Sequence, residues 1–208
     1  MNFTPIDMES YPRKQHYYYY LNKNNITYSL TAQLNVCEFV KKLKERGKKF
    51  YLSTICLVTQ AANSLPEFRM GIGENDEPGY YDYVDPSYLI FHKENSTFSF
   101  CTSEYSENFE EMYARLNEDA QKFANDYRLF TKHVPVNHID LSCLPWIQYT
   151  EMNVNAPANV KNFYPFVAWG SYGNNFLLPV SVQVSHAAAD GYHVGMFFQK
   201  LRRLIDEF

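Results

Sequence analysis

The sequence predicts an α/β (α+β) two-layer sandwich, a mixed, largely antiparallel sheet with helices packed on it, in one domain over residues 1–208. Three observations lead to this fold class. Segments in which apolar and polar residues alternate, as in half-buried strands, occur along the whole chain. Segments with apolar residues at helical spacing separate groups of these strands and do not follow each strand, unlike in βαβ folds. Proline and glycine are scattered along the chain and do not gather in a linker, which favours a single domain.

Each expected element follows from its local pattern. Residues 26–34 alternate and predict a strand, after which Asn35 stands where a helix N-cap belongs and Gly47 where the helix ends. Helices are expected at 11–21, 36–46, 51–65, 106–127 and 192–207. Further strands are expected at 80–84, 88–92, 97–102, 147–154, 164–172 and 177–185.

Composition and charge exclude several classes of protein. Aromatic residues make up 17% of the chain, too much apolar surface for a disordered protein. The formal net charge of −4 argues against a nucleic-acid partner. The basic residues at 41–49 predict a solvated helix face, with an anion-binding rim as the alternative. No apolar run reaches the length of a membrane span, and the first residues do not form a signal peptide, so we expect no membrane partner and a cytoplasmic location.

The four cysteines show no CxxC pair and no regular spacing. Reduced thiols therefore fit better than a disulfide framework or a zinc site, and we expect no metal. None of the four lies in a context that indicates a nucleophile.

The segment 179–193 carries the clearest chemical signal. An alternating strand runs into His186, three alanines, Asp190 and Gly191, and a helix follows. The alanines leave room for a bulky group to approach the imidazole, and a histidine with a nearby carboxylate can act as a general base.

Two other interpretations of this segment remain open on chemistry alone. His186 and Asp190 can be a structural histidine and an N-capping aspartate. His186, Asp190 and His193 would share one helix face as metal ligands, although Gly191 interrupts that helix and no fourth ligand is evident.

Five blocks in order along the chain resemble the chloramphenicol acetyltransferase family. The segment SVQVSHAAADGYHVGMFFQKL resembles its His-x-x-x-Asp-Gly signature, and RKQHYYYYL resembles its opening arginine, histidine and aromatic residues. The segment KFY leading into TQAANSLPEFRM is similar to its second helix, VDPSYLIFHKENSTFSF to its central hairpin, and LSCLPWIQYTEMNVN to its Ser-x-x-Pro-Trp strand. A lone His-x-x-x-Asp-Gly is a weak signal, whereas five ordered blocks are a strong one.

The resemblance implies an acyl transfer from acetyl-CoA, the expected co-substrate. His186 would take the proton of an acceptor hydroxyl, and Ser142 would stabilise the charge that develops on the carbonyl oxygen. Asp190 would pair with Arg13 and so hold the loop that carries His186. From the residues alone, Ser142 would be a turn residue and Arg13 a surface charge.

The resemblance also implies a homotrimer, with the histidine on one subunit and most of the acceptor pocket on its neighbour. The residues that match the acceptor pocket are Tyr19, Tyr20, Ile26, Tyr28, Phe98, Met152 and Val154. Tyr172 matches an aromatic residue near the CoA site. Each of these can also be an ordinary core or sheet residue.

Five positions depart from the family pattern. Ser185 replaces the first histidine of the usual pair, and Ala168 replaces a threonine that organises water. Asn24, Phe100 and Met152 stand where a leucine, a smaller residue and a phenylalanine are usual. We therefore expect an acetyl-CoA-dependent O-acetyltransferase that acts on chloramphenicol, with two alternatives: the same chemistry on another hydroxylated acceptor, or a non-catalytic binder of small molecules.

Overall fold

A computed structural model of the chain describes residues 1–24, 26–155 and 163–208. Six strands form the main sheet in the order β2-β9-β8-β7-β5-β6. Their bounds are Thr27–Asn35 for β2, Leu177–Ser185 for β9, Phe166–Trp169 for β8, His138–Cys143 for β7, Asp85–His92 for β5 and Thr97–Thr102 for β6. A smaller antiparallel sheet has the order β1-β4-β3, with β1 at Phe3–Pro5, β4 at Pro78–Tyr81 and β3 at Met70–Ile72.

The main sheet is mixed, as predicted. β2 and β8 both pair antiparallel with β9, and β5 pairs antiparallel with β6, whereas β7 runs parallel to both β5 and β8. Because β7 and β8 are paired in parallel, their carboxyl ends lie side by side. This end of the sheet carries Ser142.

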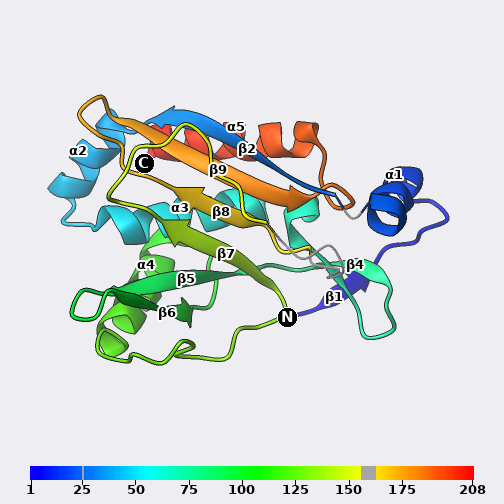
Figure 1. The fold of residues 1–208 in the computed structure, drawn as a ribbon, viewed down its shortest axis with the longest axis horizontal. Coiled ribbons are helices and arrows are strands. Elements are labelled where there is room, and N and C mark those ends of the chain that lie inside the picture. The colour runs from blue at the N-terminus through cyan, green and yellow to red at the C-terminus, as the bar shows by residue number, and fades with distance from the viewer. Residues whose placement is uncertain (25, 156–162) are drawn as a thin grey trace.

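Helices form the second layer behind the main sheet (Figure 1). They are α2 (Cys37–Glu45), α3 (Phe50–Asn63), α4 (Phe109–Lys122) and α5 (Gly191–Glu207), while α1 (Lys14–Tyr18) continues into the π-helical η1 (Tyr19–Asn24) beyond the strand ends. The short 3₁₀ helix η2 (Pro66–Arg69) follows α3. Helix α3 is buried along most of its length because it packs against the helices α4 and α5 and also against the strands β5 and β7 of the sheet.

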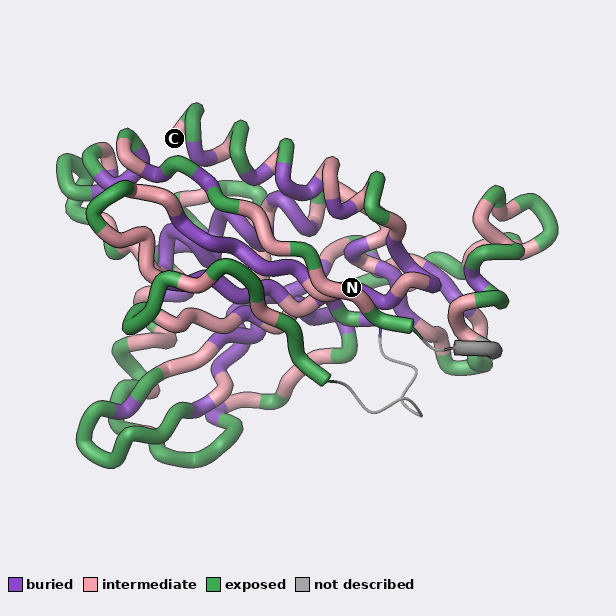
Figure 2. The backbone as a smooth tube through the Cα atoms, turned by 45° about the horizontal axis from the view of Figure 1, so that its top comes forward, coloured by how far each residue is buried: buried purple, intermediate pink, exposed green. Residues whose placement is uncertain are grey.

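The core lies between these two layers. Val167 and Trp169 of β8 and Val180 and Val182 of β9 are buried against apolar residues of α3 and α5. Figure 2 shows the same distribution, with buried backbone concentrated in the central strands and the facing sides of the helices. The helix layer thus fixes the central strands, whose ends carry the candidate site.

The predicted strand at 147–154 is wrong, and β7 was missed. Both edges of β7, β8 and β9 are already paired, and the segment after β7 pairs with neither edge strand of the main sheet, β2 or β6. Instead, Gln183 donates from Nε2 to the Val154 carbonyl and accepts from the Val154 amide, both at 2.7 Å. The sequence pattern of β7 does not predict a buried strand, because His138, Asp140 and Ser142 make one of its faces polar.

The other predicted elements are present, although the strand predicted at 164–172 shortens to β8, the helix predicted at 106–127 to α4, and the strand predicted at 80–84 begins earlier, as β4. The short strands β1 and β3 were not predicted. The predicted N-cap is off by one residue, because Val36 occupies the N-cap position of α2 and Asn35 ends β2. The Asn35 side chain still accepts from the Cys37 amide at 3.0 Å, just before the helix. The basic segment on α2 faces solvent, where Lys41 pairs with Glu38 of the same helix at 2.6 Å. Over the described residues, no helix has the length and apolar character needed to cross a membrane.

Candidate active site

The loop that follows β9 carries His186. Its three alanines, Ala187 to Ala189, are almost fully buried, so no larger side chain would fit where they pack. The His186 amide donates to the Ile26 carbonyl at 2.9 Å, which ties the loop to the start of β2. Asp190 occupies the N-cap position of α5, and Gly191 is the first residue of that helix.

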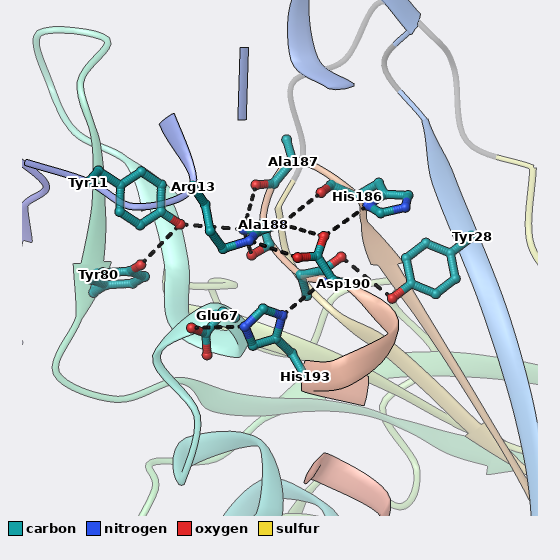
Figure 3. Close-up of polar contacts among 11 residues, drawn as sticks. Tyr11, Arg13, Tyr28, Glu67, Tyr80, His186, Ala187, Ala188, Asp190 and His193 are labelled. Atoms are coloured by element: carbon teal, nitrogen blue, oxygen red, sulfur yellow. Dashed lines mark hydrogen bonds and ion pairs between the residues drawn. The ribbon is translucent and has the colours of Figure 1, made fainter. Parts of the chain in front are cut away.

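Arg13 holds this loop from the other side (Figure 3). Its Nε donates to Asp190 Oδ2 at 3.0 Å and its Nη2 to Asp190 Oδ1 at 2.6 Å, a bidentate ion pair. Its Nη1 and Nη2 also donate to the carbonyls of His186, Ala187 and Ala188, at 3.3, 3.1 and 2.7 Å respectively. One guanidinium therefore ties down both the backbone of the loop and its carboxylate.

The ion pair keeps both partners charged. Burial acts to raise the pKa of Asp190, but the hydrogen bonds and charge of Arg13 outweigh burial and hold this pKa below its ordinary value. Burial likewise acts to lower the pKa of Arg13, and its bonds to Asp190 keep it raised. The Asp190 carboxylate is thus a permanent anion near neutral pH.

The His186 ring lies between two tyrosines of the same chain. It stacks on Tyr20 with ring centroids 3.7 Å apart and nearly parallel planes, and Tyr28 contacts it at 4.9 Å. Burial raises the pKa of Tyr28 to about 12, so this phenol stays protonated.

His186 Nδ1 lies 3.3 Å from Asp190 Oδ1, yet it is buried without a well-aligned hydrogen bond to any described residue. The side chain is 26% exposed. Nε2 is therefore the nitrogen available to a substrate, as a general base requires.

Ser142 lies near the carboxyl end of β7, directly beside Ala168 of β8. It borders a cavity of about 570 Å³ formed by mostly apolar residues of α3, β5, β6 and the turn after β7. Its aromatic lining residues are Tyr51, Tyr88, Phe91, Phe98 and Trp146. The volume suits a small molecule or the arm of a larger one.

One chain does not bring Ser142 and His186 together. The sheet register places Ser142 level with Ala168 and, through it, with Ser181 of β9. His186 follows five residues after Ser181 and lies two strands away from β7. From the usual rise per residue and the usual distance between strands, it is about 16 Å from Ser142 along the strands and about 10 Å across them. The two groups cannot contact one substrate atom within a single chain.

The remaining predicted residues divide between these places. Tyr19 is half exposed next to Tyr20, and Ile26 adjoins His186 through its carbonyl. Phe98 lies at the cavity beside Ser142, while Met152 and Val154 follow on the segment after β7. Tyr172 packs at 5.0 Å on Phe50 and stacks on Phe176. Tyr20 and Tyr28 thus lie beside the histidine of their own chain.

Four of the five departures from the family pattern are also located, and the surroundings of the Asn24 side chain lie outside what the structure describes. Ala168 is fully buried next to Ser142, and Ser185 is buried at the end of β9. Phe100 stacks on Phe130 with ring centroids 5.2 Å apart, which fills space on the same side of the sheet as Phe98. Met152 is partly exposed.

Several contacts of the site were not predicted from the sequence, in which His193 stood out only as a possible metal ligand. His193 Nδ1 accepts the Asp190 amide at 2.9 Å, and its Nε2 lies 3.5 Å from Glu67. Tyr11 accepts from Arg13 at 3.4 Å. These contacts join segments far apart in the chain, and only the position of His193, three residues after the N-cap Asp190, hinted at one of them.

The metal and thiol alternatives do not fit this geometry. Arg13 occupies the carboxylate of Asp190, and a backbone amide occupies His193 Nδ1. Burial raises the pKa of the Cys143 thiol to about 12, so it is a poor nucleophile near neutral pH. All four cysteines are free.

Known proteins match the chain along its whole length. The family model described as chloramphenicol acetyltransferase matches residues 1–202. A chloramphenicol acetyltransferase of Clostridium perfringens is 36% identical, covering 100% of this chain and 97% of that protein, and chloramphenicol acetyltransferase 2 of Escherichia coli is 37% identical over 99% and 98%. A solved chloramphenicol acetyltransferase structure superposes with a TM-score of 0.83 at 23% identity, covering 98% of this chain and all of that one. The chain therefore belongs to the chloramphenicol acetyltransferase family and is an acyltransferase.

Proposed function

We propose that this protein transfers the acetyl group of acetyl-CoA to a hydroxyl of chloramphenicol. The observation that carries the proposal is the fixed position of His186, whose loop Arg13 and Asp190 hold and whose ring lies on Tyr20. The full-length similarity to chloramphenicol acetyltransferases supports both the substrate and the co-substrate.

In the proposed reaction, His186 Nε2 takes the proton of the acceptor hydroxyl as its oxygen attacks the acetyl carbonyl carbon. The thioester C–S bond then breaks, and the protonated imidazole returns the proton to the sulfur of CoA. The nearby Asp190 carboxylate stabilises the imidazolium formed between these two steps.

Ser142 is the proposed donor to the oxyanion of the tetrahedral intermediate. Its position at the cavity beside Ala168 supports this role, because a hydroxyl at the end of a fixed strand needs little reorganisation. The apolar cavity supports a place for part of a substrate next to it, and Tyr172 stays our candidate for contact with CoA.

We also propose that the active sites lie between subunits of a homotrimer. The separation of Ser142 from His186 along and across the sheet supports a second copy that supplies the other half of each site. Exposed Tyr19, Phe98 and Val154 are candidates for residues at this contact. The free cysteines are in keeping with a reducing compartment such as the cytoplasm.

The test is release of free CoA from acetyl-CoA with and without chloramphenicol. We expect chloramphenicol-dependent release by the wild type and a loss of about 10²- to 10⁴-fold in His186→Ala. If wild type and variant give equal release with chloramphenicol and with related hydroxyl compounds, the enzymatic proposal fails, and ligand binding without turnover would favour the small-molecule binder.

A different hydroxylated acceptor is the second candidate, and Asp140 is the observation that favours it. Asp140 lies two residues before Ser142 on β7, and Ile139 and Leu141 are buried on the opposite, helix-facing side. The Asp140 side chain is 36% exposed, and its ion-pair partner among the described residues is the imidazole of His138, at 3.5 Å. Ser87, beside it in the sheet, has a buried hydroxyl with no partner among the described residues.

A carboxylate near buried unsatisfied hydroxyls favours an acceptor that offers hydrogen-bond donors or a positive charge. We would compare chloramphenicol with its deacylated amine, 2-amino-1-(4-nitrophenyl)propane-1,3-diol, in wild type and Asp140→Asn. The second candidate predicts that wild type prefers the amine and that Asp140→Asn loses this preference. A wild type that prefers chloramphenicol, with no change in Asp140→Asn, would contradict it.

A further inference from the structure

The Asp190 backbone amide makes a contact that the proposed reaction does not use. It donates to His193 Nδ1 at 2.9 Å, across the first turn of α5 (Figure 3). Other contacts also tie the loop before it: Arg13 and Tyr28 donate to its carbonyls, the His186 amide donates to the Ile26 carbonyl, and the Ser185 carbonyl accepts from the amides of Ala188 and Ala189. His193 therefore fixes the one amide of the loop that lies next to the Asp190 carboxylate.

This contact determines how the imidazole of His193 is protonated. A backbone amide can only donate, so Nδ1 must present its lone pair and the proton of the neutral ring must sit on Nε2. Nε2 lies 3.5 Å from Glu67 Oε1, where a carboxylate favours that proton. A ring protonated on both nitrogens would lose the bond to Asp190.

The surroundings hold His193 in this position. The His193 and Glu67 side chains are only 13% and 18% exposed. Phe68, next to Glu67, is fully buried and stacks on Phe197 of α5, with ring centroids 5.1 Å apart. The stack fixes η2 against the helix that carries His193, so the two ends of the contact cannot drift apart. Glu67 and His193 border a shallow surface pocket, and Lys200 and Arg203 are the basic residues of α5 that border it too.

We propose that His193 is a positioning residue of the active site. Its neutral imidazole acts through the Asp190 amide and so keeps the loop and carboxylate beside His186 in place. Arg13 holds the side chain and carbonyls of this loop, and His193 holds its amide. The proposal rests on His186 as the base of the proposed reaction, and it adds a second histidine that touches no substrate.

Two substitutions at one position separate this role from simple packing. Asparagine places Oδ1 where histidine has Nδ1, so His193→Asn keeps an acceptor for the Asp190 amide, whereas His193→Leu fills the space without one. We expect kcat in His193→Leu to fall about tenfold to a hundredfold with little change in KM, because the partly buried Asp190 amide loses its partner. His193→Asn should stay within about threefold of wild type. Arg202→Leu, an exposed change on the same helix, is the matched control.

The outcomes distinguish this proposal from the proposed function. A wild type that does not release CoA contradicts the reaction itself. An active wild type with His193→Leu equally active, or with His193→Asn as impaired as His193→Leu, overturns the positioning role alone. If His193→Leu does not fold, the ¹⁵N shifts of the wild-type imidazole decide: we expect the tautomer with its proton on Nε2, and a proton on Nδ1 would refute the contact.

Discussion

The two halves of the candidate site are built on different principles. The His186 half is polar and densely bonded, with a bidentate ion pair, three carbonyl contacts from one guanidinium and an imidazole acceptor behind it. The Ser142 half is a cavity with mostly apolar walls, bordered by exposed Phe91, Phe98 and Trp146. The first half is complete within one chain, and the second presents open surface.

The contrast teaches where each half can tolerate change. A base must keep its orientation to a fraction of an ångström, and charge-assisted hydrogen bonds supply that rigidity. An apolar pocket recognises shape, so changing one side chain shifts the acceptor preference by only about 1–3 kcal/mol. The departures from the family pattern fall in both halves: Ala168 lies beside Ser142 and Phe100 packs against Phe98 at the cavity, whereas Ser185 directly precedes His186.

The largest expected effect comes from combining chains that each lack one half. His186→Ala and Ser142→Ala should each be nearly inactive alone, by about 10²- to 10⁴-fold and 10²- to 10³-fold. Refolded together, they should regain activity far above the sum of the two, because a chain with an intact His186 can face a chain with an intact Ser142.

The control for this experiment replaces one partner with the double variant. A mixture of His186→Ala with His186→Ala/Ser142→Ala contains no intact histidine and should stay inactive. If the first mixture is no more active than this control although mixed oligomers form, the two halves do not meet between chains.

Removing Arg13 should affect stability as well as activity. Arg13→Ala leaves the partly buried Asp190 carboxylate and three carbonyls without their donor, and we expect the free energy of unfolding to fall by about 2 kcal/mol. This is less than for a fully buried pair because water reaches Asp190. Arg13→Lys should recover only part of the loss, because an ammonium cannot reproduce the planar fork.

Denaturant unfolding followed by the CoA-release assay measures both quantities. Lys41→Ala, which breaks the exposed pair with Glu38, is the matched control and should leave the unfolding midpoint nearly unchanged. Equal stability of Arg13→Ala and wild type would show that the loop does not depend on this ion pair.

The pH dependence of this ion pair has a definite sign. The pKa of Asp190 is lower in the folded protein than in the unfolded chain, so its contribution is present above its unfolded value, about 3.9, and is lost as the pH falls through the lower folded value. The difference in unfolding free energy between wild type and Asp190→Asn should be constant from about pH 8 to 5 and shrink below about pH 4. A difference that already shrinks between pH 7 and 5 would assign the stabilisation to another group.

The sequence predicted the His186 half better than the Ser142 half for a physical reason. A strand that ends in a histidine, three small residues, Asp190 and a helix is one continuous segment, so local pattern reveals it. Helices such as α3 were also predicted, because their apolar spacing is independent of what they pack against.

The contacts that complete the site are not local. Arg13 and Asp190 are separated by most of the chain, and only the resemblance to a family joined them in advance. The pairing of β7 with β5 and β8 depends on which strand edges are free in the folded chain, and the residues of β7 do not indicate which edges these are. The wrong strand at 147–154 has the same origin, since alternation predicts an extended segment but does not supply its partner.

The smallest expected effect concerns Tyr20, whose ring stacks face to face on His186, the proposed base. Its ring lies 3.7 Å from that of His186 with an interplanar angle of 6°. Such a contact is worth about 0.5–1.5 kcal/mol, so Tyr20→Leu should lower kcat/KM about threefold to tenfold, whereas Tyr20→Phe should match wild type. If Tyr20→Phe is as impaired as Tyr20→Leu, the hydroxyl and not the ring face supports the base. The rigidity of the His186 half would then extend from its backbone bonds to a further polar contact made only when the second chain or a substrate is present.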